Sequence, residues 1–155
     1  MILHLTGQRD QALLRTVGVM LMVKLSEEMK AVMAKNKIFP VATASKQGIP
    51  NVAPIAFVQL VSDDTIWIGD NYMQKSAANV KENPHMAIYF WDPESKKCFQ
   101  VKGMVSVKTS GADYEKMKQQ VKAKNEKYPA KALMVLSITE VFECTPGAGA
   151  GKKVL

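Results

Sequence analysis

Short β-prone runs separated by brief polar turns dominate the first half of the chain. The runs at 39–45 and 52–61 flank a polar segment that contains Gly48, and a Ser-Asp-Asp turn at 62–64 leads into a third run at 65–68. A β-prone run, a polar turn and a returning run predict a β-hairpin. Because parallel neighbours need long crossover connections, consecutive hairpins indicate a mostly antiparallel sheet.

The rest of the chain adds further strands and separates them with helices. The predicted strands lie at 86–91, 99–107 and 133–142, and the predicted helices at 26–36, 76–82 and 111–128. Ser26 is a favourable N-cap for the first helix, and Asn83-Pro84 ends the second. Strands and helices do not alternate as in βαβ folds. We therefore predict a mainly β fold with three helices, built as a small six-stranded antiparallel barrel.

The length and composition suit a single folded domain. The chain has 155 residues, of which 47% are hydrophobic and 23% are charged, as in globular rather than disordered proteins. No run of about 18 apolar residues predicts a membrane-spanning helix. We divide the chain into an N-terminal extension at 1–23, one domain at 24–145 and a Gly-rich basic tail at 146–155. The tail fits either a mobile segment or a basic lid or dimer strap near an anionic ligand.

The extension has the outline of a signal peptide, with Arg9 and Arg15 ahead of an apolar run at 17–23. Asp10 lies in the basic part, however, Arg15 interrupts the apolar part, and no small-residue cleavage site follows. A loosely packed extension therefore fits better. The alternative is that Met22 is the natural start of the protein.

Charge and cysteine content narrow the partners and the compartment. Lysine and arginine total 21 against 14 acidic residues, a net charge of +7, which favours an anionic partner, either nucleic acid or a small phosphate ligand. In the helix at 111–128 acidic residues interleave with the lysines, which favours a solvated face over a nucleic-acid interface. Two cysteines, Cys98 and Cys144, exclude a disulfide scaffold and suit a reducing cytoplasm. We expect a cytoplasmic protein with neither a nucleic-acid nor a membrane partner.

The familiar catalytic and metal motifs are absent from the sequence. His4 and His85 are the only histidines, neither lies near a cysteine at ligand spacing, and there is no G-x-S-x-G. The Gly-rich tail is no phosphate loop, because that pattern needs glycine at Pro146 and a hydroxyl residue at Lys153. No metal site is therefore predicted, and no catalytic residue is assigned.

Three segments in order carry a family resemblance. They read FPVATASKQGIPNVAPI at 39–55, IGDNYMQKSAANVKENP at 68–84, and AIYFWDP at 87–93 followed by FQVKG at 99–103. This set resembles the pyridoxamine 5′-phosphate oxidase-like family of FMN-binding split barrels over residues 26–144. The resemblance implies a split β-barrel and a homodimer that binds FMN, and it implies a small oxidoreductase with an unknown electron donor and acceptor.

The resemblance also implies a set of cofactor-binding residues. The strand at 51–55 would meet the flavin ring with backbone groups, and Pro54 suits this because its missing N–H places it at an edge or bulge. The loop at 70–76 would hold the ribityl chain and phosphate, with Lys75 as a cation and Ser76 as a hydroxyl donor at a helix N-terminus. The predicted cofactor-binding residues are Asn51, Val52, Pro54, Ile55, Asp70, Asn71, Gln74, Lys75 and Ser76.

Several positions depart from the true oxidases. Those enzymes place cations where Ala53, Val58 and Ser76 stand and a flavin-contacting glutamine where Cys98 stands. Their C-terminal segment that grips pyridoxal has no counterpart here, so oxidation of vitamin B6 is not expected. Known relatives of the fold leave a deazaflavin, another flavin or haem open as cofactor. The alternative function is a flavin or deazaflavin carrier, or an electron-transfer module without a substrate of its own.

Overall fold

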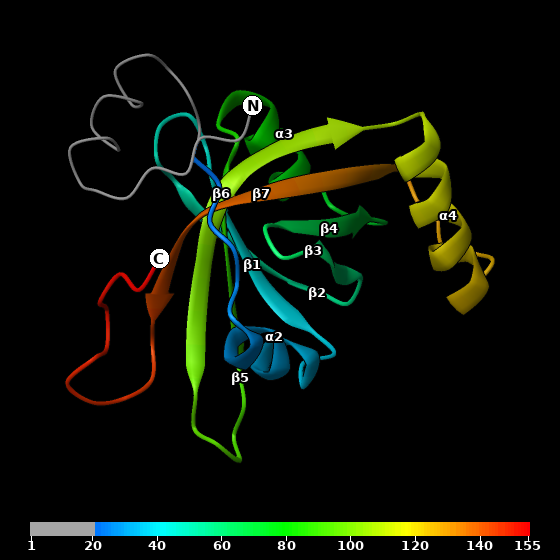
Figure 1. Ribbon diagram of the computed structural model, residues 1–155. Coiled ribbons are helices and arrows are strands. Elements are labelled where there is room, and N and C mark those ends of the chain that lie inside the picture. Colours follow the sequence, from blue (N-terminus) through cyan, green and yellow to red (C-terminus); the bar gives the residue numbers. More distant parts are fainter. Residues whose placement is uncertain (1–20) are drawn as a thin grey trace, which may run out of the picture.

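The computed structural model describes residues 21–155. This part of the chain contains three helices and seven strands (Figure 1). The elements are, in chain order, α2 (Glu27–Ala34), β1 (Phe39–Ala44), β2 (Pro50–Ile55), β3 (Val58–Ser62), β4 (Thr65–Asp70), α3 (Lys75–Glu82), β5 (His85–Trp91), β6 (Cys98–Lys108), α4 (Ala112–Lys124) and β7 (Ala132–Glu143). No helix in this range is both long and apolar enough to cross a membrane.

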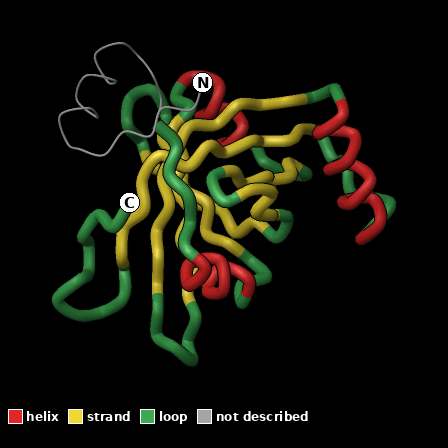
Figure 2. The backbone as a smooth tube through the Cα atoms, viewed as in Figure 1, coloured by secondary structure: helices red, strands yellow, loops and turns green. Residues whose placement is uncertain are grey.

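All seven strands belong to one antiparallel sheet, in the order β2-β1-β5-β6-β7-β4-β3. The sheet curls on itself, so that its long central strands support short strands at both ends (Figure 2). The predicted mainly β antiparallel split barrel is confirmed. Strands β2 and β3 form the two edges of the sheet although they are neighbours in the sequence.

The seventh strand comes from the run at 52–61, which the sequence predicts as one strand. The structure divides this run, because β2 ends at Ile55 and β3 begins at Val58. The chain leaves one edge of the sheet and joins the other through Ala56 and Phe57, and the Phe57 carbonyl accepts a hydrogen bond from Gly69 N on β4 (3.0 Å). Both connecting residues are apolar, so no polar turn residue indicates the break. The six-strand prediction is therefore one strand short.

The core lies inside the curl of the sheet and under the helices. Its largest fully buried side chains include Phe90, Ile66, Ile88 and Leu136, and burial stabilises each by about 1.5–3 kcal/mol relative to exposure. A second, smaller cluster attaches α4 to the sheet, with Trp67, Met117, Val121, Ala130 and Leu133 in contact. Met117 and Val121 are four residues apart and therefore share one face of α4.

The long strands β6 and β7 are bent by an irregularity at Lys102 and Gly103, where their register shifts. A Cβ atom on Gly103 would lie 2.0 Å from the carbonyl oxygen of Ser137 on β7. Real Cβ atoms do not approach backbone so closely, so only glycine allows the two strands to meet here. The bend helps to close the sheet into the split barrel.

All three predicted helices are present, but their ends differ from the predicted bounds. Ser26 is the N-cap of α2, as predicted, and its Oγ accepts a hydrogen bond from Met29 N (3.3 Å). Helix α4 is shorter than the predicted 111–128, because Asn125 leaves the helical conformation. Tyr128 therefore lies in the loop between α4 and β7. Helix α3 begins at Lys75, so Ser76 lies inside its first turn.

The tail at 146–155 runs back along the outer half of β7. Lys153 forms a bridge with Phe142, and Val154 N donates to the Val141 carbonyl (2.8 Å). Lys153 Nζ also pairs with Glu140 (3.1 Å). These contacts place the end of the tail beside β7. The predictions for the extension at 1–23, apart from residues 21–23, lie outside the described residues.

Candidate functional site

A cavity of about 630 Å³ opens beside edge strand β2, where it meets the β4–α3 loop and α4. Its size lies in the range of small-molecule and cofactor sites, about 300–1,000 Å³. We call it the split cavity. It is lined by residues 51–57, Gly69, residues 71–76, Val121, Lys124 and Tyr128.

The structure brings eight of the nine predicted cofactor-binding residues to this one cavity. Asn51, Val52, Pro54, Ile55, Asn71, Gln74, Lys75 and Ser76 line it, and Asp70 does not. Asp70 is buried; its carboxylate accepts a hydrogen bond from Met73 N (2.9 Å) and lies 3.5 Å from Lys131 Nζ. Asp70 therefore holds the loop in shape rather than facing the cavity.

The N-terminal turn of α3 presents a cradle of donors to the cavity. Gln74 occupies the N-cap position, and its side chain makes no capping hydrogen bond. The first N–H groups of a helix have no partner within the helix, and together with the helix dipole they favour an anion. The exposed Lys75 side chain adds a positive charge at the same place. This combination suits a phosphate group.

Ser76 is placed to contribute its hydroxyl proton to that cradle. The residue is 2% exposed, and its Oγ accepts a hydrogen bond from Asn51 Nδ2 (3.0 Å). Accepting this bond leaves the Ser76 hydroxyl proton available for a ligand. Asn51 and Ser76 come from β2 and α3, so this hydrogen bond also joins the two sides of the cavity.

Two residues that were not predicted from the sequence, Thr43 and Asn79, support the contact between Asn51 and Ser76. Thr43 on β1 is buried, and its Oγ1 accepts from Asn79 Nδ2 on α3 (3.0 Å) and from Asn51 Nδ2 (3.4 Å). The network fixes the position of α3 against β1 and β2. Thr43 has the pattern of an ordinary strand residue in the sequence, so only the folded structure reveals this role.

Strand β2 forms the opposite wall. It pairs only with β1, so its other edge carries backbone groups without a strand partner. Pro54 lies on this edge strand, which confirms its prediction as an edge residue, and faces Pro40 in the register with β1. Val52 is 66% exposed and gives this wall an apolar surface.

The third wall was not predicted. It consists of Val121 and Lys124 of α4 and Tyr128 of the following loop, together with Phe57 and Tyr72, which face them. Lys124 Nζ lies 5.5 Å from the centre of the Phe57 ring. The Tyr72 and Tyr128 rings meet edge to face with their centres 6.4 Å apart. The sequence predicts a solvated helix face for Lys124, because helix periodicity does not reveal which end of a helix borders a cavity.

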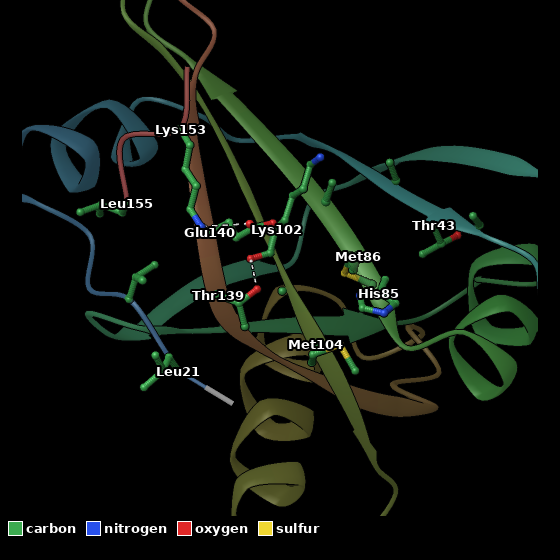
Figure 3. A pocket seen from close by; sticks show the side chains of 15 residues that line it. Leu21, Thr43, His85, Met86, Lys102, Met104, Thr139, Glu140, Lys153 and Leu155 are labelled. Carbon is green, nitrogen blue, oxygen red and sulfur yellow. Dashed lines mark hydrogen bonds and ion pairs between the residues drawn. The ribbon is translucent and has the colours of Figure 1, made fainter. Parts of the chain in front are cut away.

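A second cavity of about 590 Å³ lies on the outer surface of β1, β5, β6 and β7, and we call it the outer cavity (Figure 3). Lys153 and Glu140 in its lining pair with each other, whereas Lys102 contacts an aromatic ring. Lys153 Nζ pairs with Glu140 (3.1 Å), and Lys102 Nζ lies 4.8 Å from the centre of the Phe142 ring. His85 lines this cavity at the start of β5. None of the predicted cofactor-binding residues lies here.

Cys98, aligned with a flavin-contacting residue of the oxidases, does not line the split cavity. It lies opposite Cys144 where β6 and β7 meet, and Cys144 N donates to the Cys98 carbonyl (2.8 Å). Burial, with a smaller contribution from neighbouring Cys144, raises the pKa of the Cys98 thiol. Both thiols are free, and residues 21–155 contain no group of three His, Cys, Asp or Glu side chains placed to hold a metal ion.

Comparison with known proteins gives one family and several relatives. The family model described as pyridoxamine 5′-phosphate oxidase matches residues 25–145. An uncharacterized protein of Methanocaldococcus jannaschii is 34% identical over 135 residues, which cover 85% of this chain and 89% of that protein.

Solved structures share the fold. HupZ from Group A Streptococcus is 28% identical with a TM-score of 0.71, covering 82% of this chain and 99% of that one. An FMN-binding protein from Syntrophomonas wolfei is 18% identical with a TM-score of 0.66, covering 87% and 92%. An F420 reductase is 19% identical with a TM-score of 0.59, covering 76% and 98%.

Proposed function

The chain belongs to the pyridoxamine 5′-phosphate oxidase family, and we propose that it is a small flavin-dependent oxidoreductase that binds FMN in the split cavity. The observation that carries this proposal is the cradle at the start of α3. There, unpartnered helix N–H groups, the Lys75 ammonium and the Ser76 hydroxyl converge on one cavity. The predicted residues of β2 and the β4–α3 loop line that same cavity.

Different groups of residues would bind different parts of the cofactor. The α3 cradle would hold the phosphate, since backbone N–H groups and a lysine are the donors that phosphate recruits. The β2 edge would lie along the flavin ring, where Val52 and Ile55 supply apolar contact and the free backbone groups supply hydrogen bonds. Asn71 and Gln74 lie between these regions in the cavity lining and suit the hydroxyls of the ribityl chain.

Bound flavin supplies the redox chemistry, namely the exchange of electrons with a small donor and acceptor. The protein itself binds and orients the flavin. The lining contains no carboxylate and no imidazole; its ionisable or hydroxyl-bearing side chains are Lys75, Lys124, Ser76, Tyr72 and Tyr128. We therefore propose cofactor-binding residues and assign no general acid or base.

The second candidate is a carrier of flavin or deazaflavin that transfers electrons without a substrate of its own. The absence of cations at Ala53 and Val58, where the oxidases have them, and the shared fold of an F420 reductase keep a deazaflavin open as its cofactor. Oxidation of NADH or NADPH with candidate acceptors would favour the enzyme. Photoreduction of the bound cofactor without such turnover would favour the carrier.

We further propose a homodimer in the cytoplasm. Tyr89 and Trp91 on the outer face of β5 are 45% and 51% exposed, and neighbouring large apolar side chains of this kind are typical of interfaces. Cys98 and Cys144 are adjacent yet free, which suits a reducing compartment. Light scattering and the thiol content of protein from native cells test these two proposals.

The test of the cofactor is an absorption spectrum of the purified protein, followed by titration with FMN, a deazaflavin and haem. Flavin bands that co-elute with the protein are expected. Lys75→Gln should raise the Kd for FMN about 10- to 100-fold, because a charge-assisted hydrogen bond contributes about 1.5–3 kcal/mol and each 1.4 kcal/mol is tenfold. Lys81→Gln on the same helix is the matched control. Equal affinity of both variants, or uptake of haem in place of FMN, would overturn the proposal.

A further inference from the structure

The two cysteines of the chain lie opposite each other where the β6–β7 ladder ends. The register of this ladder pairs Phe99 with Glu143, so the next position outward places Cys98 opposite Cys144. The Cys144 N–H donates to the Cys98 carbonyl (2.8 Å). The sequence contains no other cysteine, and neither thiol lines the split cavity. The pair therefore has no role in the proposed cofactor site.

The type of strand pairing sets the backbone separation of the two cysteines. The backbone of Glu143 faces away from β6, because its N–H donates to the Lys152 carbonyl (2.9 Å) and its carbonyl accepts from Gly151 N (2.7 Å). Hydrogen-bonded and non-hydrogen-bonded positions alternate along an antiparallel ladder, so Cys98 and Cys144 occupy a hydrogen-bonded position, where opposite Cα atoms lie about 5.5 Å apart. A disulfide needs Cα atoms about 4.4–6.8 Å apart. The strands can therefore be bridged without moving.

The two thiols share one face of the sheet and are open to small molecules. Directly opposite residues of an antiparallel pair project from the same face, and both cysteines are only partly buried. Burial, and to a smaller extent the neighbouring Cys144, raises the pKa of the Cys98 thiol. A higher pKa leaves less Cys98 thiolate at neutral pH, and the thiolate is the reactive form. The first attack on an external disulfide therefore falls to Cys144.

Hydrogen bonds on both sides hold the two cysteines in place. The Thr145 hydroxyl, next to Cys144, accepts from Cys98 N (3.0 Å). Asp92 N donates to the Lys97 carbonyl (2.9 Å), which closes the turn ahead of Cys98. Two groups fixed beside each other react with a high effective concentration. A modified Cys144 is therefore held within reach of the Cys98 thiol.

We propose that Cys98 and Cys144 form a thiol–disulfide redox site, which small disulfides of the glutathione type oxidise and the matching thiols reduce. First, the Cys144 thiolate attacks one sulfur of the small disulfide, whose S–S bond breaks and releases one small thiolate. The Cys98 thiolate then attacks the Cys144 sulfur of this mixed disulfide and releases the second small thiolate.

The exchange balances in electrons and protons. The cysteine pair loses two electrons, which reduce the small disulfide to two thiols. The two released thiolates take up the two protons that Cys98 and Cys144 lose. The exchange needs no flavin and is independent of the split cavity.

The test equilibrates the folded full chain with glutathione disulfide and glutathione at a series of ratios and fixed total concentration. Alkylation and intact mass then count the free thiols. Both thiols should disappear together, with a mass loss of two hydrogens and no retained glutathione, and excess glutathione should restore them. The same titration in urea is the reference. Because a disulfide that stabilises the fold is stabilised by it, the folded chain should be half-oxidised at a disulfide-to-thiol ratio at least about tenfold lower.

Two serine variants test the order of attack. Cys98→Ser should retain one glutathione on Cys144 as a stable mixed disulfide, because the second nucleophile is missing. Cys144→Ser should be modified at least about tenfold more slowly, since Cys98 has the raised pKa. Equal rates for the two variants would overturn Cys144 as the first nucleophile.

The titration of the native chain decides the redox site itself, whether or not the variants fold. The proposal is overturned if the folded chain needs the same ratio as the chain in urea, or a higher one. It is also overturned if oxidation stops at a mixed disulfide on the native chain. A disulfide-linked dimer on a denaturing gel without reductant would overturn it too, because the two thiols would then face a second copy and not each other.

Discussion

The two cavities of this protein have nearly equal volumes, about 630 Å³ and 590 Å³, yet their walls are chemically different. The outer cavity lies on strands that are paired with neighbours, and its Lys153 and Glu140 neutralise each other. The split cavity lies where pairing ends, at edge strand β2 and the first turn of α3. Its two lysines have no acidic partner in the lining. Volume therefore does not distinguish a binding site here, whereas free backbone donors do.

The difference follows from the topology of the sheet. A paired strand has already used its backbone groups, so a hollow on its surface offers only side chains to a ligand. An edge strand and a helix N-terminus both retain free backbone groups, and the split cavity has one of each. This contrast predicts that substitutions at the outer cavity change at most the stability of the fold. Substitutions at the split cavity should change the affinity for the cofactor.

The largest expected effect is structural and belongs to the outer cavity. Gly103→Ala would place a Cβ atom 2.0 Å from the Ser137 carbonyl oxygen, so β6 and β7 would have to separate. We expect a loss of about 3 kcal/mol or more in the free energy of unfolding, at the upper end of overpacking effects, measured by urea denaturation.

Gly48→Ala is the matched control for this change. Gly48 has a φ of +82° and no atom within 4 Å of an added Cβ, so only the left-handed backbone cost of about 1–2 kcal/mol applies. Equal losses for the two variants would show that the close approach of β6 and β7 at Gly103 is not important for stability.

The next effect concerns the loop of the split cavity. Asp70→Asn removes the charge that pairs with Lys131 and weakens the acceptor for Met73 N. Hydrogen bonds to charged groups contribute about 1.5–3 kcal/mol, and we expect a loss of about 2 kcal/mol together with a higher Kd for FMN. Glu140→Gln breaks the exposed pair at the outer cavity and should cost below about 1 kcal/mol with no change in the Kd. A larger loss of stability for Glu140→Gln than for Asp70→Asn in urea denaturation would contradict this comparison.

A smaller effect tests the buried hydroxyl of the cradle. Ser76→Ala removes the acceptor for Asn51 Nδ2 and the donor proposed for the phosphate. The hydroxyl is one of several donors to the same phosphate, so its loss should cost about 0.5–1.5 kcal/mol and raise the Kd for FMN about two- to tenfold in a fluorescence titration. Ser106→Ala on the exposed face of β6 should leave it unchanged. An unchanged Kd for Ser76→Ala would remove Ser76 from the cofactor site.

The smallest effect lies at the β3–β4 turn, outside both cavities. Hydrogen bonds from Ser62 Oγ (2.7 Å) and Thr65 Oγ1 (2.9 Å) hold the pKa of the Asp64 carboxyl below its ordinary value. A lowered pKa stabilises the folded state above the unfolded-state value, about 3.9, and this contribution is lost as the pH falls through the folded-state value. Asp64→Asn should therefore cost below about 1 kcal/mol at pH 7 and less at pH 3, by urea denaturation. A cost that grows toward pH 3 would reverse the expected sign.

Local patterns in the sequence predict much of this fold. Hairpin signals around Gly48 and the turn at 62–64 predict the antiparallel sheet, and the missing N–H of Pro54 predicts its edge position. The break at Ala56 and Phe57 is not predictable in this way, because two apolar residues continue the strand pattern while the chain crosses to the other edge of the sheet. That crossing is a property of the whole sheet and not of any local run.

The candidate site, like the fold, is only partly predictable from the sequence. The family resemblance is enough to assign the residues of β2 and of the β4–α3 loop to one common site. Lys124 and Tyr128 are distant in sequence from these segments, and their pattern is that of a solvated lysine-rich helix. Only the packing of Met117 and Val121 against the sheet orients α4 so that its last turn borders the cavity.

The two-residue connection between β2 and β3 also bears on how such proteins diversify. Ala56 and Phe57 are the whole covalent link between the two edges of the sheet, and both line the split cavity. Insertions at this link would lengthen one rim of the cavity without shifting the register of any strand pair. A longer link would therefore change the size of the cavity while leaving the barrel itself unchanged.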